Sequence, residues 1–293
     1  MVNKKNILVT GSKGQLGQSI KKNAHKFLNY NFYFKDKAQL DITKFDSLHT
    51  CIKKNEINII INCAAYTNVE KAEKERDIAN MVNHIAVDNI SKICKQKKIQ
   101  LIHISTDYVF DGLKISPYNE NDKPNPISYY GKSKLKGERK MMSHKLKNSA
   151  IIRTSWLYSM YAENFLLKIL SNIKSLDSFS VVNDEHGSPT NANDLAVLIL
   201  NILPKLKNDT EIYHFSNLGF CSRFNFAYQI KEYCKENVTI KPKQTYNDKS
   251  IRPKFSALDS SKIINKFGLN IDDWSSSLRN MLEIEKVYNS NEI

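Results

Sequence analysis

The sequence predicts an α/β fold: a Rossmann-type doubly wound parallel sheet with a smaller C-terminal α/β domain. Strand-like apolar runs alternate with helical patterns over the first 155 of the 293 residues. These runs are apolar on both faces, as parallel strands covered by helices must be. A glycine-rich turn follows the first run directly, which is typical of the βα units in such sheets.

The strand predictions rest on short runs rich in isoleucine, valine and phenylalanine. They fall at residues 6–10, 31–35, 57–65, 100–106 and 150–155. Helical patterns occupy the intervals, at residues 15–27, 43–54, 77–97 and 129–146. Asp41 and Thr43 offer N-cap oxygens for the second of these helices.

The remaining sequence keeps a mixed α/β pattern. Strand-like segments cover residues 178–184 and 211–217, and helices are predicted near residues 193–206 and 223–235. We expect a first domain over residues 1–155 and a second, interleaved domain mainly over residues 156–293, with strand 211–217 returning to the first. Because no repeat or low-complexity linker separates them, the two parts should pack closely.

The composition argues against two classes of partner. The formal net charge is +14, but only six of the 44 basic residues are arginines and the lysines are scattered, so we expect no nucleic-acid partner. A positive field of this kind can still raise the rate of encounter with an anionic substrate. No apolar run approaches the roughly 18 residues of a membrane span, so we expect no membrane partner.

The cysteines indicate the compartment. There are five, an odd number, and none shows Cys-x-x-Cys spacing. Cys63 lies inside an apolar run, where a buried thiol behaves as a small hydrophobe. Together with the absence of an apolar targeting segment before the first strand, this predicts reduced thiols and a cytoplasmic location.

The glycine-rich turn "GSKGQLG" places Gly11, Gly14 and Gly17 between a strand and a helix. Glycines let the backbone turn sharply and approach a pyrophosphate, whose charge sits at the helix N-terminus. The turn therefore predicts a dinucleotide cofactor, with Gln15 and Leu16 in the binding segment. A tight turn with incidental glycines is the alternative. The first domain is accordingly expected to bind NAD(P).

The end of the second strand bears on the choice of cofactor. Asp36 can accept hydrogen bonds from a ribose 2′-hydroxyl, which favours NADH, whereas Lys35 or Lys37 can pair with a 2′-phosphate, which favours NADPH. The pattern leaves both open. Asp41 and Ile42 are candidates to border the adenine, although Asp41 could act only as a cap.

The chain also carries a Tyr-x-x-x-Lys pair, Tyr130 and Lys134, downstream of Ser105 and Thr106. Positions four apart lie on one face of a helix, so both side chains can point to the same place. A nearby cation favours the phenolate, and we expect the Lys134 ammonium to lower the pKa of Tyr130 and make it a general acid. The spacing alone occurs by chance in many helices.

Several strings together resemble a known family. They include "GSKGQLG", "LDIT", "NCAAYTNVEKAE", "STDYVFDG", "YYGKSKLKGE", "IRTSWLY", "GSPT", "NDLA" and "RPKFSALD". The chain resembles the extended branch of the short-chain dehydrogenase/reductase superfamily, and most closely the dTDP-4-dehydrorhamnose reductase family. The resemblance implies reduction of dTDP-4-dehydro-L-rhamnose to dTDP-L-rhamnose with NADPH or NADH. It also implies a dTDP-sugar substrate and a site within one chain, in a monomer or homodimer.

The resemblance assigns roles to the catalytic residues. Tyr130 becomes the proton donor, and Lys134 should also hold the nicotinamide ribose. Thr106 should hydrogen-bond the carbonyl oxygen, although it could instead cap the following loop. Ala64 and Ala65, after the third strand, should let the backbone approach the cofactor.

The resemblance also implies substrate contacts. Thr67 and Val69 should face the sugar, and Trp156 corresponds to a tryptophan beside the hexose ring, although a tryptophan at a strand end is often a core residue. Arg252 is a candidate clamp on the diphosphate, because a guanidinium fits phosphate oxygens as a fork. Its alternative role is a solvated loop charge.

Some relatives place Mg²⁺ at a dimer contact through glutamates, where this chain has Ser19 and Asn193. Mg²⁺ is therefore possible but not supported by the sequence, and we predict no metal ligands.

Asn83 matches a helix asparagine of the family near the active site, and His103 is expected to be a core residue.

Other functions remain open at this point. Another sugar-nucleotide 4-ketoreductase, or a 4-epimerase of the same fold, would share the Tyr/Lys pair. A 4,6-dehydratase commonly carries Thr-Asp-Glu, where this chain reads Thr106-Asp107-Tyr108. A non-catalytic regulatory subunit related to that of methionine adenosyltransferase is the alternative from another class.

Overall fold

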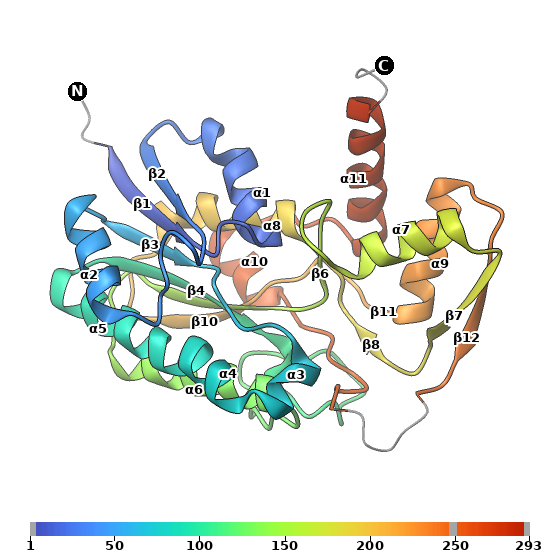
Figure 1. Ribbon diagram of the computed structural model, residues 1–293, viewed down its shortest axis with the longest axis horizontal. Helices are drawn as coiled ribbons and strands as arrows, with labels where there is room; N and C mark the ends of the chain where they lie inside the picture. The colour runs from blue at the N-terminus through green and yellow to red at the C-terminus, as the bar shows by residue number, and fades with distance from the viewer. Residues whose placement is uncertain (1–3, 246–250, 290–293) are drawn as a thin grey trace.

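A six-stranded parallel sheet forms the centre of the computed structural model, which describes residues 4–245 and 251–289 (Figure 1). The strand order is β10-β5-β4-β3-β1-β2. The bounds are β1 (Lys5–Thr10), β2 (Tyr30–Lys35), β3 (Ile59–Asn62), β4 (Gln100–Thr106), β5 (Ala150–Thr154) and β10 (Glu211–His214). All neighbouring pairs in this sheet are parallel, which confirms the predicted doubly wound α/β fold.

Helices cover both faces of the sheet (Figure 1). One layer holds α1 (Gln15–Asn23), α8 (Ala192–Ile202) and α10 (Ser261–Phe267). The other holds α2 (Phe45–Lys54), α5 (Ala86–Lys97) and α6 (Tyr129–Ser143). Side chains alternate between the two layers along each strand. In β1, Ile7 and Val9 enter the first core, whereas Leu8 enters the second.

A smaller body lies beside the carboxyl ends of the strands (Figure 1). Its elements are β6 (Leu157–Tyr158), α7 (Phe165–Ser175), β7 (Ser178–Val182), β8 (His186–Gly187), β9 (Thr190–Asn191), β11 (Cys221–Ser222), α9 (Arg223–Cys234), β12 (Thr239–Lys243) and α11 (Trp274–Asn289). Its separate apolar core includes Tyr158, Phe226 and Leu278. The chain leaves this body to form α8, β10 and α10 on the large sheet, so the segment that begins at Glu211 pairs with β5.

Several boundaries differ from the sequence expectation. The third strand ends at Asn62 instead of residue 65, because Cys63 and Ala64 turn to pack against Gly11. Helix α2 begins at Phe45, and its N-cap is Lys44 without a side-chain bond. The expectation that Asp41 or Thr43 caps this helix is therefore wrong.

Other helical segments complete the layers. The helix expected over residues 77–97 consists of α4 (Arg76–Asn80), a π-helical segment (Met81–Ile85) and α5. It is preceded by α3 (Val69–Lys74). Short 3₁₀ turns are η1 (Ala24–Lys26), η3 (Asp107–Val109) and η4 (Leu203–Lys205). No disulfide links any of the five cysteines, and none of the helices in the described ranges is long and apolar enough to span a bilayer.

Candidate functional site

The glycine turn lies at the point where the strand order reverses, between β1 and β3. Ligands of open α/β sheets bind at such switch points, outside the carboxyl ends of the strands. Gly11 has φ +64°, and a Cβ there would lie 2.7 Å from the Ala64 nitrogen. A Cβ on Gly17 would lie 2.5 Å from the Gly11 oxygen. The turn therefore closes on itself and on the end of β3 only because these positions lack side chains.

The first turn of α1 is arranged for an anion. Its N-cap is Gly14, which supplies no side-chain acceptor to the helix amides. Gln15 and Leu16 begin the helix, and the Gln15 side-chain Nε2 donates to the Leu157 carbonyl at 3.2 Å. Helix N-termini without a side-chain cap are ready-made phosphate sites. The loop geometry thus fits the diphosphate of a dinucleotide.

Asp36 lies at the end of β2, facing the glycine turn. Its Oδ2 is 2.6 Å from the Lys13 ammonium, and its Oδ1 accepts from the Gln39 amide. The hydrogen bond from Lys13 is the main cause that holds the pKa of Asp36 below its ordinary value. Lys13 was missed by the sequence reasoning, which considered only Lys35 and Lys37 as cations near a ribose.

Asp41 and Ile42 lie after β2 with different surroundings. Asp41 Oδ1 accepts from the amide and the hydroxyl of Thr43, and these bonds hold its pKa below the ordinary value. Ile42 is buried in the core beneath α2. Asp41 thus closes a local turn.

Tyr130 stands in the first turn of α6, next to η3. Its ring meets the Tyr108 ring edge-on, with 5.7 Å between the centroids. Burial raises the pKa of Tyr130 above its ordinary value of 10, and a side-chain hydrogen bond with Thr106 opposes this only in part. The expectation of a lowered Tyr130 pKa is wrong for this arrangement. The geometry does bring Tyr130 and Thr106 together, as expected.

The position of Lys134 explains why the pKa of Tyr130 is not lowered. Its side chain is 1% exposed, and its ammonium donates to the Ile104 carbonyl of β4 at 2.5 Å and lies 3.5 Å from His103 Nε2. Burial lowers the pKa of Lys134 to about 8, against the opposing charge of Glu138. The ammonium is therefore turned toward the sheet instead of toward the phenol oxygen.

Asp107 is a second residue that the sequence reasoning did not select. It is 2% exposed, and its Oδ1 accepts from the Thr106 hydroxyl at 2.9 Å. Burial raises the pKa of Asp107 to about 6, while Ser256, Thr106 and the Arg223 charge act in the opposite direction. Perturbed carboxyl groups of this kind gather at functional sites.

The expected substrate residues lie where the two bodies meet. Thr67 is exposed in the loop after β3, and Val69, the first residue of α3, is buried. Arg252 donates to the Tyr108 hydroxyl at 3.1 Å and pairs with Glu70 at 3.3 Å. Arg252 is therefore tied to η3, next to Tyr130, and to α3.

Trp156 adopts a backbone conformation that is rare for a large side chain, with φ +44°. Such outliers gather at functional sites. The Arg223 guanidinium lies over its ring, 3.6 Å from the centroid, and burial lowers the pKa of Arg223. Trp156 also packs against the core of the smaller body. Arg223 was missed because nothing in its local sequence indicates this stacking.

The loop after β3 carries Ala64 and Ala65 and is joined to the helices by Asn83. Ala64 and Ala65 are partly exposed after β3. Asn83, in the π-helical segment, accepts from the Tyr66 amide at 2.9 Å and donates to the Tyr66 carbonyl and to Ser133 Oγ. It therefore fastens the loop after β3 to the helix that carries Tyr130.

The positions considered for Mg²⁺ carry neutral side chains. Asn193 accepts from Asn23 at 2.7 Å, and the Ser19 hydroxyl donates to the Gln15 carbonyl. Within the described ranges, no group of three or more histidine, cysteine or carboxylate side chains could hold a metal ion.

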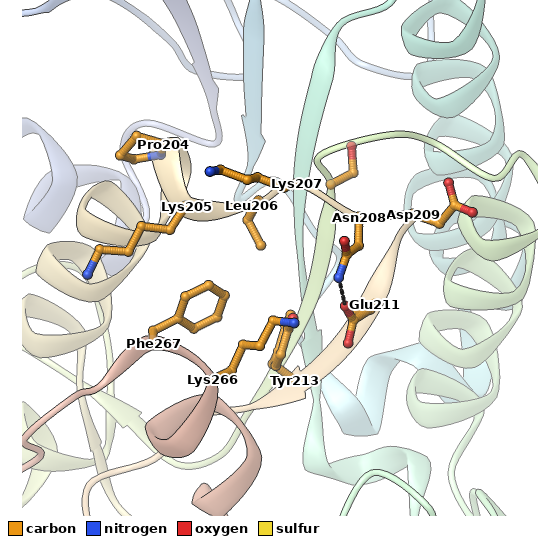
Figure 2. A pocket seen from close by; sticks show the side chains of 11 residues that line it. Pro204, Lys205, Leu206, Lys207, Asn208, Asp209, Glu211, Tyr213, Lys266 and Phe267 are labelled. Atoms are coloured by element: carbon orange, nitrogen blue, oxygen red, sulfur yellow. Dashed lines mark hydrogen bonds between the residues drawn. The ribbon is translucent and has the colours of Figure 1, made fainter.

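Two surface cavities lie at the amino ends of the strands. One, of about 420 Å³, is lined by Lys207, Tyr213, Lys266 and Phe267 among others (Figure 2). The other, of about 620 Å³, is lined in part by Lys5, at the amino end of β1. Both are remote from the carboxyl ends of the strands, where the glycine turn and Tyr130 lie, so neither belongs to the candidate site.

Comparisons with known proteins agree with this geometry. The family model described as "RmlD substrate binding domain" matches residues 5–287. A dTDP-4-dehydrorhamnose reductase of Aggregatibacter actinomycetemcomitans is 37% identical, over 94% of this chain and 97% of its own length. The crystal structure of a Bacillus anthracis dTDP-4-dehydrorhamnose reductase in complex with NADP has a TM-score of 0.88 at 36% identity, covering 95% of this chain and 99% of that one.

A more distant comparison shows the fold alone. UDP-glucose 4-epimerase of Thermus thermophilus has a TM-score of 0.81 at 16% identity, covering 95% of this chain and 98% of that one. The nearer matches extend over both bodies, including the segments that carry Tyr130, Trp156 and Arg252. The chain therefore belongs to the dTDP-4-dehydrorhamnose reductase family.

Proposed function

We propose that this protein is an NAD(P)H-dependent oxidoreductase that reduces dTDP-4-dehydro-L-rhamnose to dTDP-L-rhamnose in dTDP-rhamnose biosynthesis. Family membership over almost the whole chain supports the reaction class. The observation that carries the proposal is the placement of Tyr130, Thr106 and Lys134 beside the glycine turn, at the carboxyl ends of β1, β3 and β4.

The cofactor, when bound, supplies the hydride that reaches C4 of the sugar. Tyr130 donates a proton to the oxygen on which negative charge develops, and Thr106 hydrogen-bonds the same oxygen. Burial keeps the phenol protonated at neutral pH, so it enters the reaction as an acid. With a pKa of about 8, Lys134 is mostly charged at pH 7. Its ammonium is held at the Ile104 carbonyl, so it would stabilise the phenolate that remains through its charge and not through a direct hydrogen bond.

The cofactor contacts are proposed from the geometry of the turn and strand ends. The diphosphate would lie against the first turn of α1 and the adenosine near the end of β2. The nicotinamide would lie near Tyr130. The residues are Gly11, Gly14, Gln15, Leu16, Gly17, Asp36, Asp41, Ile42, Ala64, Ala65, Tyr130 and Lys134. Because Lys13 pairs with Asp36, a cation and a carboxylate share the ribose region, which is consistent with use of both NADPH and NADH.

The substrate contacts are proposed on the other side of Tyr130. Trp156, stacked beneath Arg223, would face the hexose. Arg252 would exchange its exposed partner Glu70 for the diphosphate, since a guanidinium binds phosphate oxygens in a fork. Thr67 and Val69 would border the sugar from the loop after β3 and the start of α3.

The reaction is tested by incubating the purified protein with NADPH or NADH and a panel of keto-sugar nucleotides, followed by NMR of the product. We expect stoichiometric cofactor oxidation with dTDP-4-dehydro-L-rhamnose and a dTDP-L-rhamnose product. Release of bound NAD on denaturation, with turnover that needs no added reductant, would instead indicate an epimerase. Cofactor binding without turnover of any substrate would indicate a regulatory protein.

The role of Tyr130 is tested with Tyr130→Phe. Loss of the proton donor should lower kcat by about 10²-fold or more, in the range of general acid catalysis. The dissociation constant of NADPH, measured by fluorescence titration, should change little. Exposed Tyr228→Phe on α9 serves as the matched control. A Tyr130→Phe variant with wild-type kcat would remove the assignment.

A further inference from the structure

A row of buried polar side chains crosses the sheet beneath the candidate site. On the face covered by α5 and α6, the strands present an apolar layer that includes Leu8, Ile60 and Leu101. Two residues further along, the same face carries Thr10, Asn62 and His103. The sheet register pairs Thr10 with Asn62 and Asn62 with His103. Three neighbouring strands thus end their apolar layer in one continuous polar row.

Hydrogen-bonding distances join this row to α6. Thr10 Oγ1 lies 2.7 Å from Asn62 Oδ1, and Asn62 Nδ2 lies 3.1 Å from His103 Nδ1. His103 Nε2 lies 3.5 Å from Lys134 Nζ. No member of the row is more than 1% exposed. Such groups are expensive to bury unless they bond one another, so the row is built as a unit.

The row can be satisfied in two ways, because a carboxamide can exchange its oxygen and nitrogen and an imidazole can carry its proton on either nitrogen. If the Asn62 nitrogen donates to Nδ1, the proton of neutral His103 is on Nε2, which then faces the donors of Lys134. If the Asn62 oxygen accepts from Nδ1–H and its nitrogen donates to Thr10, Nε2 is free to accept from Lys134. The atom positions of Asn62 correspond to the first arrangement. A charged Lys134 favours the second, in which Nε2 offers a lone pair to the ammonium.

We propose that His103 is a positioning residue for Lys134: its neutral, Nδ1-protonated imidazole, fixed by Asn62 and Thr10, accepts a hydrogen bond from the ammonium. This inference rests on the proposed reductase function, in which the charge of Lys134 stabilises the phenolate of Tyr130. Together with the Ile104 carbonyl, Nε2 gives the buried ammonium a second acceptor on β4.

The row also reaches the cofactor turn. Thr10 immediately precedes Gly11, and its hydroxyl lies 3.4 Å from the Ala64 amide. The same three strand ends therefore fix the glycine turn, the segment after β3 and the catalytic ammonium relative to one another. A change at His103 should accordingly be felt in cofactor binding as well as in the chemical step.

Other ionisable groups around Lys134 also affect its pKa. Glu138, one turn further along α6, favours the charged form, as does the Cys63 thiol after β3. Glu138 is itself paired with buried Arg153 of β5 at 2.7 Å. Burial, and to a smaller extent the Lys134 charge, keep the pKa of His103 well below its ordinary value, so the imidazole stays neutral.

The first test reads the tautomer directly and does not depend on substrate. A long-range ¹H–¹⁵N correlation spectrum of the protein at pH 7, with the His103 signals identified by their loss in His103→Gln, should show a protonated Nδ1 and an unprotonated Nε2. A proton on Nε2 overturns the proposal, whether or not the protein turns over any sugar nucleotide.

The second test separates positioning from folding. His103→Leu removes the acceptor, whereas His103→Gln places an amide oxygen near the position of Nε2. We expect His103→Leu to lower kcat about tenfold and to move the alkaline limb of the kcat/KM profile to lower pH by about one pH unit, since the unsupported ammonium loses its proton more easily. His103→Gln should restore both to near the wild-type values.

The control for general damage to the core is Asn23→Leu, which removes a buried amide at the far end of α1. It should lower the melting temperature without moving the pH profile. A His103→Leu variant with the wild-type profile and kcat overturns the proposal. Absence of turnover by the wild-type protein with every keto-sugar nucleotide would overturn the proposed function instead, and the tautomer would still decide the role of His103.

Discussion

Replacing Asp107 with asparagine should make the protein more stable at neutral pH. The Asp107 side chain is 2% exposed, and Oδ2 receives no hydrogen bond of good geometry from the described residues. Burial raises the pKa from 3.8 to about 6. This difference corresponds to about 3 kcal/mol in favour of the protonated form. At pH 7 the Asp107 carboxylate is therefore ionised in the folded protein, and its burial lowers the free energy of unfolding.

The sign follows from proton binding. Between about pH 4 and about pH 6 the folded state binds more protons at this site than the unfolded chain does, so wild-type stability falls as the pH rises. Asparagine has nearly the same shape and no titrating proton. The difference in free energy of unfolding, variant minus wild type, should therefore grow by about 2 kcal/mol between pH 4 and pH 7.

Urea unfolding followed by tryptophan fluorescence at pH 4, 5, 6 and 7 measures this difference. Asp209→Asn is the matched control, because the Asp209 carboxylate is exposed and its bond with Lys147 lowers its pKa. That variant should show no gain at neutral pH. If the difference for Asp107→Asn is the same at pH 4 and pH 7, the carboxyl does not titrate as its burial requires and the reasoning is refuted.

Three further changes test other parts of the structure. Gly17→Ala places a Cβ 2.5 Å from a carbonyl oxygen of the turn, so the NADPH dissociation constant should rise at least about tenfold in a fluorescence titration. Lys13→Ala frees Asp36 and should raise KM for NADPH more than KM for NADH. Arg153→Met leaves Glu138 as an unpaired buried charge and should lower the free energy of unfolding by about 3–5 kcal/mol.

Each of these has an outcome that contradicts it. Unchanged NADPH affinity in Gly17→Ala would show that the turn does not hold the cofactor. Equal effects on both KM values in Lys13→Ala would exclude a contact with a 2′-phosphate. Arg153→Met combined with Glu138→Gln should recover most of the lost stability, because the unpaired charge is then gone. Failure of the double variant to do so would place the damage in packing instead.

The sequence was a good guide to the elements of the large sheet. The run 100–106 is rich in apolar and β-branched residues, and β4 has these bounds. The same criterion extended the third strand too far, because Cys63, Ala64 and Ala65 are small and apolar for another reason. Cys63 and Ala64 let the chain approach Gly11, a contact across more than 50 residues that no local pattern reveals.

In the candidate site, too, the sequence predicted the local features but not the long-range contacts. The spacing of Tyr130 and Lys134 correctly indicated a shared helix, α6. It could not indicate that the Ile104 carbonyl would hold the ammonium, because that acceptor belongs to a strand 30 residues away. Asp107 and Arg223 were missed because the relation between them exists only after the smaller body has folded against the sheet.

The repeated passage of the chain between the two bodies limits how it can be divided or recombined. A fragment that ended near residue 155 would leave β5 as an open sheet edge and α1 without its neighbour α8. Open apolar edges of this kind invite association with other chains. A chimaera that exchanges only the sugar-facing part must therefore be joined at several points, with α8, β10 and α10 left in the parent sequence.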